Sequence, residues 1–116
     1  MKTKIAKKIK KNLVIDRKLW LRGGEDSYLL RESDKKMCCL GFLMLTNGVK
    51  TKEISGVSEP FDVEFTPLLD KNGDNSSVAD ELINLNDDIL LGEEARENKI
   101  KEIFKKDLGV NCRFIN

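Results

Sequence analysis

The sequence predicts one α+β domain over residues 1–116, with several helices packed on a small antiparallel sheet. Three observations favour this class. A chain of 116 residues with 40% hydrophobic residues suits one compact core. The apolar run from Met37 to Leu45 has the length and composition of a buried helix. The last residues alternate apolar and polar side chains, as a half-buried strand does.

The first expected element is a basic amphipathic helix over residues 1–18 that can fray. Ile5, Ile9 and Leu13 recur every four residues, which places them on one face of a helix. Thr3 stands where an N-cap residue would lie. This pattern predicts a narrow apolar stripe on an otherwise lysine-rich helix.

The expected sheet combines two segments that are far apart in the sequence. A helical turn near Trp20, ended by Gly23, precedes a strand over residues 27–32. The second strand covers residues 110–115. We expect the two strands to pair antiparallel. The apolar side of the second strand consists of Val110, Cys112 and Phe114.

A buried central helix is predicted between these strands. Asn47 and Gly48 provide a left-handed stop after the apolar run. Gly41 inside this helix costs about 1 kcal/mol relative to alanine, so we expect another part of the chain to cross close to it. The residues expected in the structural core are Cys38, Cys39, Leu40, Phe42 and Leu43.

Three further helical segments follow. Thr51 occupies a capping position for one turn. Ser77 and Asp80 have the spacing of a capping box at the start of a helix. The last helix has acids in its first turn and lysines in its last, which suits the helix dipole, and Gly109 ends it. Its apolar stripe is formed by Ile100, Ile103, Phe104 and Leu108.

Charge is distributed unevenly along the chain. The net charge is +1, but residues 1–22 hold nine Lys/Arg against Asp16 alone. A lysine-dense helix can dock on phosphate backbones or on an acidic protein face. The alternative interpretation is a solvated helix that keeps the protein soluble. The candidate interaction residues on it are Lys4, Lys7, Lys8, Lys10 and Lys11.

The composition argues against several function classes. The chain has no histidine, which excludes Ser-His-Asp and Cys-His nucleophile pairs and histidine-bearing zinc sites. No stretch approaches the roughly 20 apolar residues of a spanning helix, and no signal-peptide pattern is found. Three cysteines, an odd number, suit a reducing compartment. We therefore expect a cytoplasmic protein that has no membrane contact and no cofactor.

The adjacent thiols Cys38 and Cys39 allow two interpretations. Neighbouring positions on a helix point about 100° apart, so the two thiols cannot both face one metal or form a relaxed disulfide. Lys35 and Lys36 could activate a thiolate nearby. Free cysteine is, however, among the residues most often fully buried, which favours core packing.

The segment from Asp70 to Glu81 has the ligand spacing of an EF-hand calcium loop. Its candidate metal ligands are Asp70, Asn72, Asp74, Ser76 and Glu81. Three departures weaken the match: Asn75 replaces the usual glycine, Ser77 replaces a hydrophobic residue, and Pro67 interrupts the entering helix. The alternative is a polar turn that leads into a capped helix.

Several of these segments also resemble small proteins encoded by bacteriophages, prophages and other mobile elements. The likeness lies in "LWLRGGEDSYLLRESDKKMCCLGFLMLTNGV", "LINLND" and "GVNCRFI", with a Cys-Cys-Leu-Gly helix and an Asn-Asp turn. The resemblance implies a phage-like origin and a location in the cytoplasm of a bacterial host. It carries over no active-site residues.

Together these features predict a role in binding rather than catalysis. The leading hypothesis is a phage or mobile-element accessory protein that docks on a host macromolecule, for example as an inhibitor of a host or defence enzyme. A host protein is the expected partner, and nucleic acid is an alternative through the basic N-terminus. The other hypotheses are a calcium-binding module at residues 70–81 and a cysteine- or carboxylate-dependent enzyme.

Overall fold

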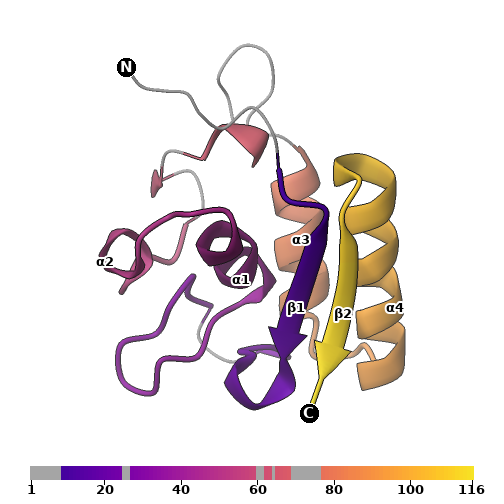
Figure 1. Ribbon diagram of the computed structural model, residues 1–116. Helices are drawn as coiled ribbons and strands as arrows, with labels where there is room; N and C mark the ends of the chain where they lie inside the picture. Colours follow the sequence, from indigo (N-terminus) through magenta and orange to yellow (C-terminus); the bar gives the residue numbers. More distant parts are fainter. Residues whose placement is uncertain (1–8, 25–26, 60–61, 64, 69–76) are drawn as a thin grey trace.

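The computed structural model describes residues 9–24, 27–59, 62–63, 65–68 and 77–116. In this part of the chain, β1 (Asn12–Asp16) and β2 (Asn111–Ile115) form a sheet of two parallel strands, with Ile15 beside Phe114 (Figure 1). The predicted antiparallel sheet is therefore wrong. Parallel strands need a long crossover connection, and here that connection contains the helices.

The predicted strand over residues 27–32 does not join this sheet. The Leu29 amide donates to Val57 O (2.7 Å), and the Gly56 amide donates to Leu30 O (2.8 Å). The Cys38 amide donates to Tyr28 O (3.1 Å). Because these backbone groups already form hydrogen bonds elsewhere, the segment does not pair with β2. The place beside β2 belongs instead to β1.

The helix predicted over residues 1–18 is wrong from Ile9, the first described residue: residues 9–11 are not helical, and β1 begins at Asn12. Leu13 and Ile15 are buried whereas Val14 is 38% exposed, so this stretch follows the two-residue period of a strand. Pairing with β2 outweighs the helical spacing of Leu13, and residues 1–8 lie outside the described residues. The predicted turn near Trp20 is a short 3-10 helix, η1 (Arg17–Leu19).

The predicted central helix is confirmed as α1 (Cys39–Thr46), with Cys38 as its N-cap residue. The helix ends at Asn47, and Gly48 adopts a left-handed φ of 95°. Helix α1 contacts β1 and α3, and α4 contacts α3 and β2 (Figure 1). The helices thus cover the face of the sheet that carries Leu13 and Ile15.

The predicted close approach at Gly41 is also confirmed. A Cβ placed on Gly41 would lie 2.0 Å from Leu29 O and 2.9 Å from Met37 Cβ. The segment before α1 therefore crosses directly over this position. Only glycine allows the two backbones to approach so closely.

The remaining helices are α2 (Thr51–Ile54), η3 (Thr66–Leu68), α3 (Ser77–Asp87), α4 (Glu93–Ile103) and η4 (Phe104–Leu108), the last being one turn of π-helix. Among these helices, the three predicted segments are found, and η3 was not predicted. Lys50, rather than Thr51, is the N-cap residue of α2. Gly109 ends η4 with a φ of 69°, as its sequence position predicts. In the described residues, no helix has the length and apolar character needed to cross a membrane.

Asn86, near the end of α3, joins three segments within the core and is fully buried. Its Oδ1 accepts from Trp20 Nε1 (2.8 Å) and from the Cys39 amide (3.1 Å). Its Nδ2 donates to Leu21 O (2.8 Å) and to Asp87 Oδ1 (3.0 Å). One side chain therefore satisfies an amide at the start of α1 and fixes the Trp20 segment against α3.

Candidate functional site

The turn between α3 and α4, Asp88–Gly92, presents two hydrophobic side chains to solvent. Ile89 is 72% exposed and Leu90 is 91% exposed. Single exposed hydrophobic residues are ordinary, but adjacent ones on a tight turn form a small apolar surface. We refer to residues 88–92 as the α3–α4 turn. This surface is not among the sites predicted from the sequence, although three apolar residues directly before a glycine are an unusual composition for a turn.

Arg96 holds the α3–α4 turn from inside and is 4% exposed. Its Nε donates to Leu85 O (3.2 Å), and its Nη2 donates to Leu91 O (3.1 Å) and to Asp88 O. Its Nη1 donates to Glu93 Oε1 (3.1 Å). A buried guanidinium is costly unless its donors are satisfied. These bonds both satisfy it and fix the backbone of the turn.

Two glycines lie directly beneath the turn. Gly23 and Gly24 have φ values of 72° and 87°, which side-chain-bearing residues rarely adopt. A Cβ on Gly24 would lie 2.1 Å from Ile89 Cγ2, and one on Gly23 would lie 3.5 Å from Arg96 Nη2. The Gly23 amide also donates to Asn86 O (2.8 Å). The turn is therefore supported by the backbone of residues 23–24.

Ion pairs connect the start of α4 to the Trp20 segment. Arg17 Nε and Nη2 each donate to a Glu97 carboxylate oxygen at 2.7 Å, which raises the pKa of Arg17. Arg22 Nη2 lies 2.6 Å from Glu93 Oε2, and its guanidinium stacks on the Trp20 ring, 4.6 Å from the centroid. The guanidinium groups of Arg17 and Arg22 are thus both paired with carboxylates of α4.

The sequence around the turn is rich in carboxylates. They are Asp87, Asp88, Glu93 and Glu94. Asp88 Oδ1 accepts from the Leu90 amide (2.9 Å), which further orders the turn, and Glu93 is the carboxylate that both Arg22 and Arg96 contact. Glu94 is exposed. Carboxylates therefore flank the two apolar residues of the tip in the sequence, and Glu93 among them is neutralised by Arg22 and Arg96.

The predicted basic interaction residues fall into two groups. Lys4, Lys7 and Lys8 lie outside the described residues. Lys10 and Lys11 are exposed directly before β1, in backbone that is not helical. The Lys10 amide donates to Asn47 Oδ1 (2.7 Å), which connects this segment to the end of α1.

The predicted calcium ligands lie mostly outside the described residues. Asp70, Asn72, Asp74 and Ser76 lie outside the described residues. Glu81 is exposed on α3. Within the described ranges, no group of three or more His, Cys, Asp or Glu side chains is arranged to hold a metal ion.

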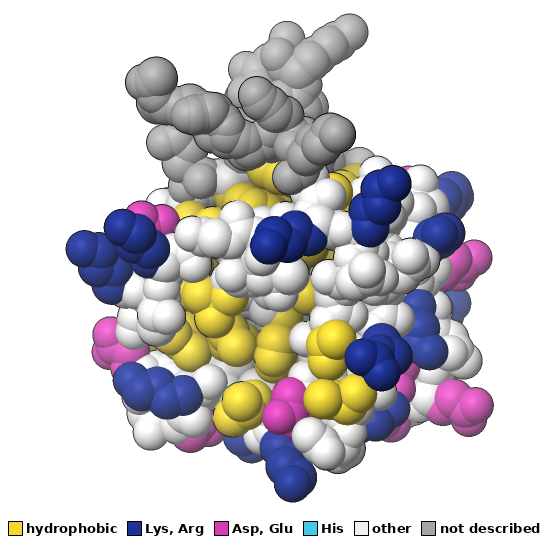
Figure 2. All heavy atoms as spheres, in the orientation of Figure 1, with side chains coloured by type: hydrophobic (Ala, Val, Ile, Leu, Met, Phe, Trp, Pro, Cys, Tyr) yellow, Lys and Arg dark blue, Asp and Glu magenta, His cyan; other side chains and the backbone are white. Residues whose placement is uncertain are grey.

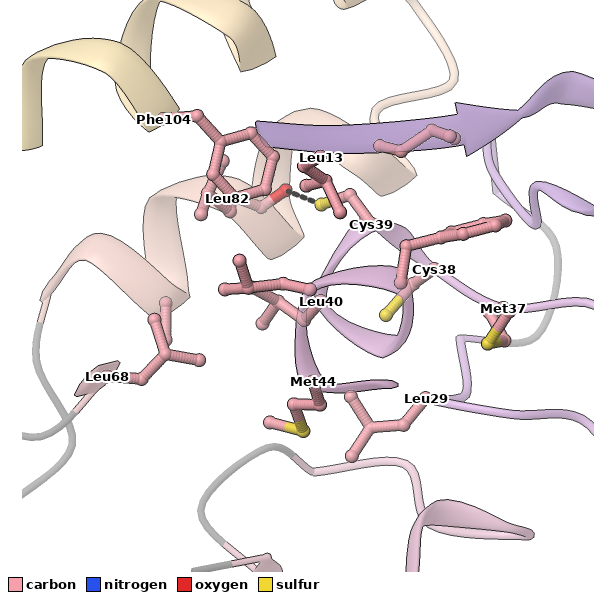
Figure 3. Close-up of a cluster of buried hydrophobic side chains, with 14 of the residues drawn as sticks. Leu13, Leu29, Met37, Cys38, Cys39, Leu40, Met44, Leu68, Leu82 and Phe104 are labelled. Carbon is pink, nitrogen blue, oxygen red and sulfur yellow. Dashed lines mark hydrogen bonds between the residues drawn. The ribbon is translucent and has the colours of Figure 1, made fainter. Parts of the chain in front are cut away.

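The five residues expected in the core, including Cys38 and Cys39, are all buried. Figure 3 shows the two thiols among hydrophobic side chains, with Cys39 close to Leu13, Leu82 and Phe104. Cys39 Sγ donates to Leu82 O over 3.8 Å. Burial raises the pKa of Cys38 to about 11 and raises that of Cys39 well above its usual range. Neither thiol has the cationic, accessible surroundings of a nucleophile.

We expect Cys38 and Cys39 to be unreactive toward a thiol reagent at pH 8 in the native protein, and to react rapidly once it is unfolded. The pKa of the Cys38 thiol rises from 9.0 in the unfolded chain to about 11 in the folded protein. Its contribution to stability is therefore fully present below about pH 9 and is lost as the pH rises through about 11. Rapid native-state labelling of both thiols would contradict their structural role.

The stability of the Cys39→Ser variant is a second test of whether the thiol is buried. The substitution should lower the free energy of unfolding by about 1–3 kcal/mol. The serine hydroxyl would be buried, and Leu82 O, which lies 3.8 Å from the thiol sulfur, is too far away for a normal O–H···O bond. Ser55→Ala is a suitable control, since Ser55 lies outside the core and its hydroxyl bonds to Glu32 at an exposed site. Denaturant unfolding of both variants gives the comparison.

No protein-family model, curated protein or solved structure matches this chain.

Proposed function

We propose that this chain is a phage or mobile-element accessory protein that acts by binding a host protein through the α3–α4 turn. One observation carries the proposal: Ile89 and Leu90 project into solvent from a turn that buried Arg96 fixes in place. The phage-like origin rests on the resemblance of the Cys-Cys-Leu-Gly and Asn-Asp segments. A bacterial host protein as the partner follows from that origin.

The fixed turn favours binding for an energetic reason. Burying each of the two exposed side chains in a partner would contribute about 1.5–3 kcal/mol. Ordering a flexible loop on association would offset part of that gain. Because Arg96, Asp88 and the two glycines already order this turn, little of the gain is lost.

The acidic residues on either side of the apolar tip indicate the chemistry of the partner. Asp87, Asp88 and Glu94 lie next to or near the apolar tip in the sequence, and Arg96 already contacts Glu93. A complementary partner would offer an apolar pocket with lysine or arginine side chains around it. Figure 2 shows hydrophobic atoms in view over the region of α1, where the side chains of Leu40, Phe42 and Met44 are themselves buried.

Site-specific photocrosslinking in bacterial cells tests this proposal. A photoreactive amino acid placed at Leu90 should form a covalent adduct with the partner. The same amino acid at Val14, which is 38% exposed on the sheet, is the matched control. We expect an adduct from position 90 that position 14 does not give. Identical adducts from both positions, or none specific to position 90, would contradict the proposal.

A further inference from the structure

A group of lysines lies at the opposite end of the molecule from the α3–α4 turn. Strands β1 and β2 begin at this end, and η4 leads into it (Figure 1). We call its four lysines the basic end: Lys10, Lys11, Lys105 and Lys106. In Figure 2, several lysine and arginine side chains lie at the upper right, over the region where α4 ends.

Hydrogen bonds bring these lysines together from separate parts of the chain. The Asn111 amide donates to Lys11 O (2.6 Å), and Lys105 Nζ donates to Asn111 Oδ1 (3.0 Å). The residue after Lys11 begins β1, and Asn111 begins β2. The parallel pairing therefore places lysines from both ends of the sequence side by side, which the basic N-terminal segment alone does not predict.

The lysines of the basic end are not paired with acids within the described residues. All four of them are exposed. The acids nearest to Lys105 and Lys106 in sequence are Glu102 and Asp107.

We infer that the basic end binds the phosphate backbone of nucleic acid, without recognising base sequence. Lysine is depleted from the centres of protein interfaces but is a standard contact to phosphate. Across the described residues, no aromatic side chain is fully exposed, so bases would have nothing to stack on. The inference does not depend on the α3–α4 turn, which lies at the other end.

Fluorescence anisotropy with a labelled DNA duplex tests this inference. The affinity should fall steeply between about 50 and 200 mM salt, because each neutralised phosphate releases condensed counterion. The combined variant Lys10→Ala, Lys11→Ala, Lys105→Ala, Lys106→Ala should bind at least tenfold more weakly. It should also reduce the salt slope by roughly 2–4.

The matched control removes lysines elsewhere on the surface. Lys52→Ala with Lys99→Ala takes two exposed lysines from α2 and from the middle of α4, and should leave both the affinity and the salt slope nearly unchanged. Leu90→Ser should likewise have no effect on DNA binding. Amide NMR shifts during the titration should be largest near Lys11, Lys105 and Asn111.

Four results would overturn the inference. The wild-type protein could fail to bind the duplex at low salt. The variant that lacks all four lysines could bind as tightly as the wild type. The largest amide shifts could lie away from the basic end. Polyglutamate could displace the duplex at equal charge concentration, which would identify an acidic protein as the better ligand.

Discussion

Replacing Asn86 with alanine should lower the free energy of unfolding by about 3–5 kcal/mol. The change removes bonds from the buried Trp20 Nε1 and the Cys39 amide, and it leaves Leu21 O without its donor. Each buried polar group left unsatisfied costs about 1–3 kcal/mol. Because the side chain is fully buried, water cannot easily replace it. Denaturant unfolding followed by circular dichroism measures the loss.

Asn84→Ala is the matched control, since Asn84 is exposed on the same helix. That variant should change stability by no more than about 0.5 kcal/mol. Asn86→Asp should also be strongly destabilising, because the carboxylate cannot donate to Leu21 O and would be charged in the core. A cost below about 1 kcal/mol for Asn86→Ala would show that Asn86 does not join these segments in solution.

The Gly41→Ala variant should lose about 3 kcal/mol of stability, although alanine ordinarily favours a helix over glycine by about 1 kcal/mol. The new methyl group would lie 2.0 Å from Leu29 O, which is backbone and cannot rotate away. Overpacking of this kind costs about 1–3 kcal/mol and occasionally more. Thermal or denaturant unfolding would detect a change of this size.

Gly92→Ala is the control for this substitution. Gly92 has a φ of −67° at the N-cap position of α4, and a Cβ there would have no neighbour within 4 Å. Its replacement should change stability by about 1 kcal/mol or less. If Gly41→Ala were as mild as Gly92→Ala, the close crossing of the 27–37 segment over α1 would be incorrect.

Local signals in the sequence predict much of this fold. The apolar run with its Asn47-Gly48 stop predicts α1, and the charge distribution with Gly109 predicts the last helix. The alternation before Phe114 predicts β2. The cost of glycine within a helix predicts the close approach at Gly41. Each of these depends on residues that are near one another in sequence.

The pairing partner of β2 could not be chosen in the same way. Leu13 fits a helical stripe with Ile9 and also a strand with Ile15, so the local pattern is ambiguous. Pairing between residues about one hundred positions apart decides the outcome: Ile15 lies beside Phe114, and Leu13 beside Cys112. Because β1, and not the segment 27–32, pairs with β2, the sheet is parallel and not antiparallel as predicted.

The α3–α4 turn could not be predicted as a binding site because both its exposure and its fixed conformation depend on tertiary contacts. Ile89, Leu90 and Leu91 look like any short apolar stretch in the sequence, and only the structure shows the first two exposed. Arg96 appears in the sequence as a counter-charge among acids. Its role in fixing the turn follows from burial and from carbonyl groups that the sequence does not place near it.

The binding role of the α3–α4 turn is tested most directly by the affinity of the Leu90→Ser variant for the protein captured by crosslinking. With that partner purified, titration calorimetry should show that Leu90→Ser raises the Kd about tenfold or more, because one buried leucine contributes about 1.5–3 kcal/mol. The free energy of unfolding should stay within about 0.5 kcal/mol of wild type, since the side chain is 91% exposed. Val14→Thr should leave the Kd unchanged. An equal Kd for Leu90→Ser and wild type would contradict the proposed binding role of the turn.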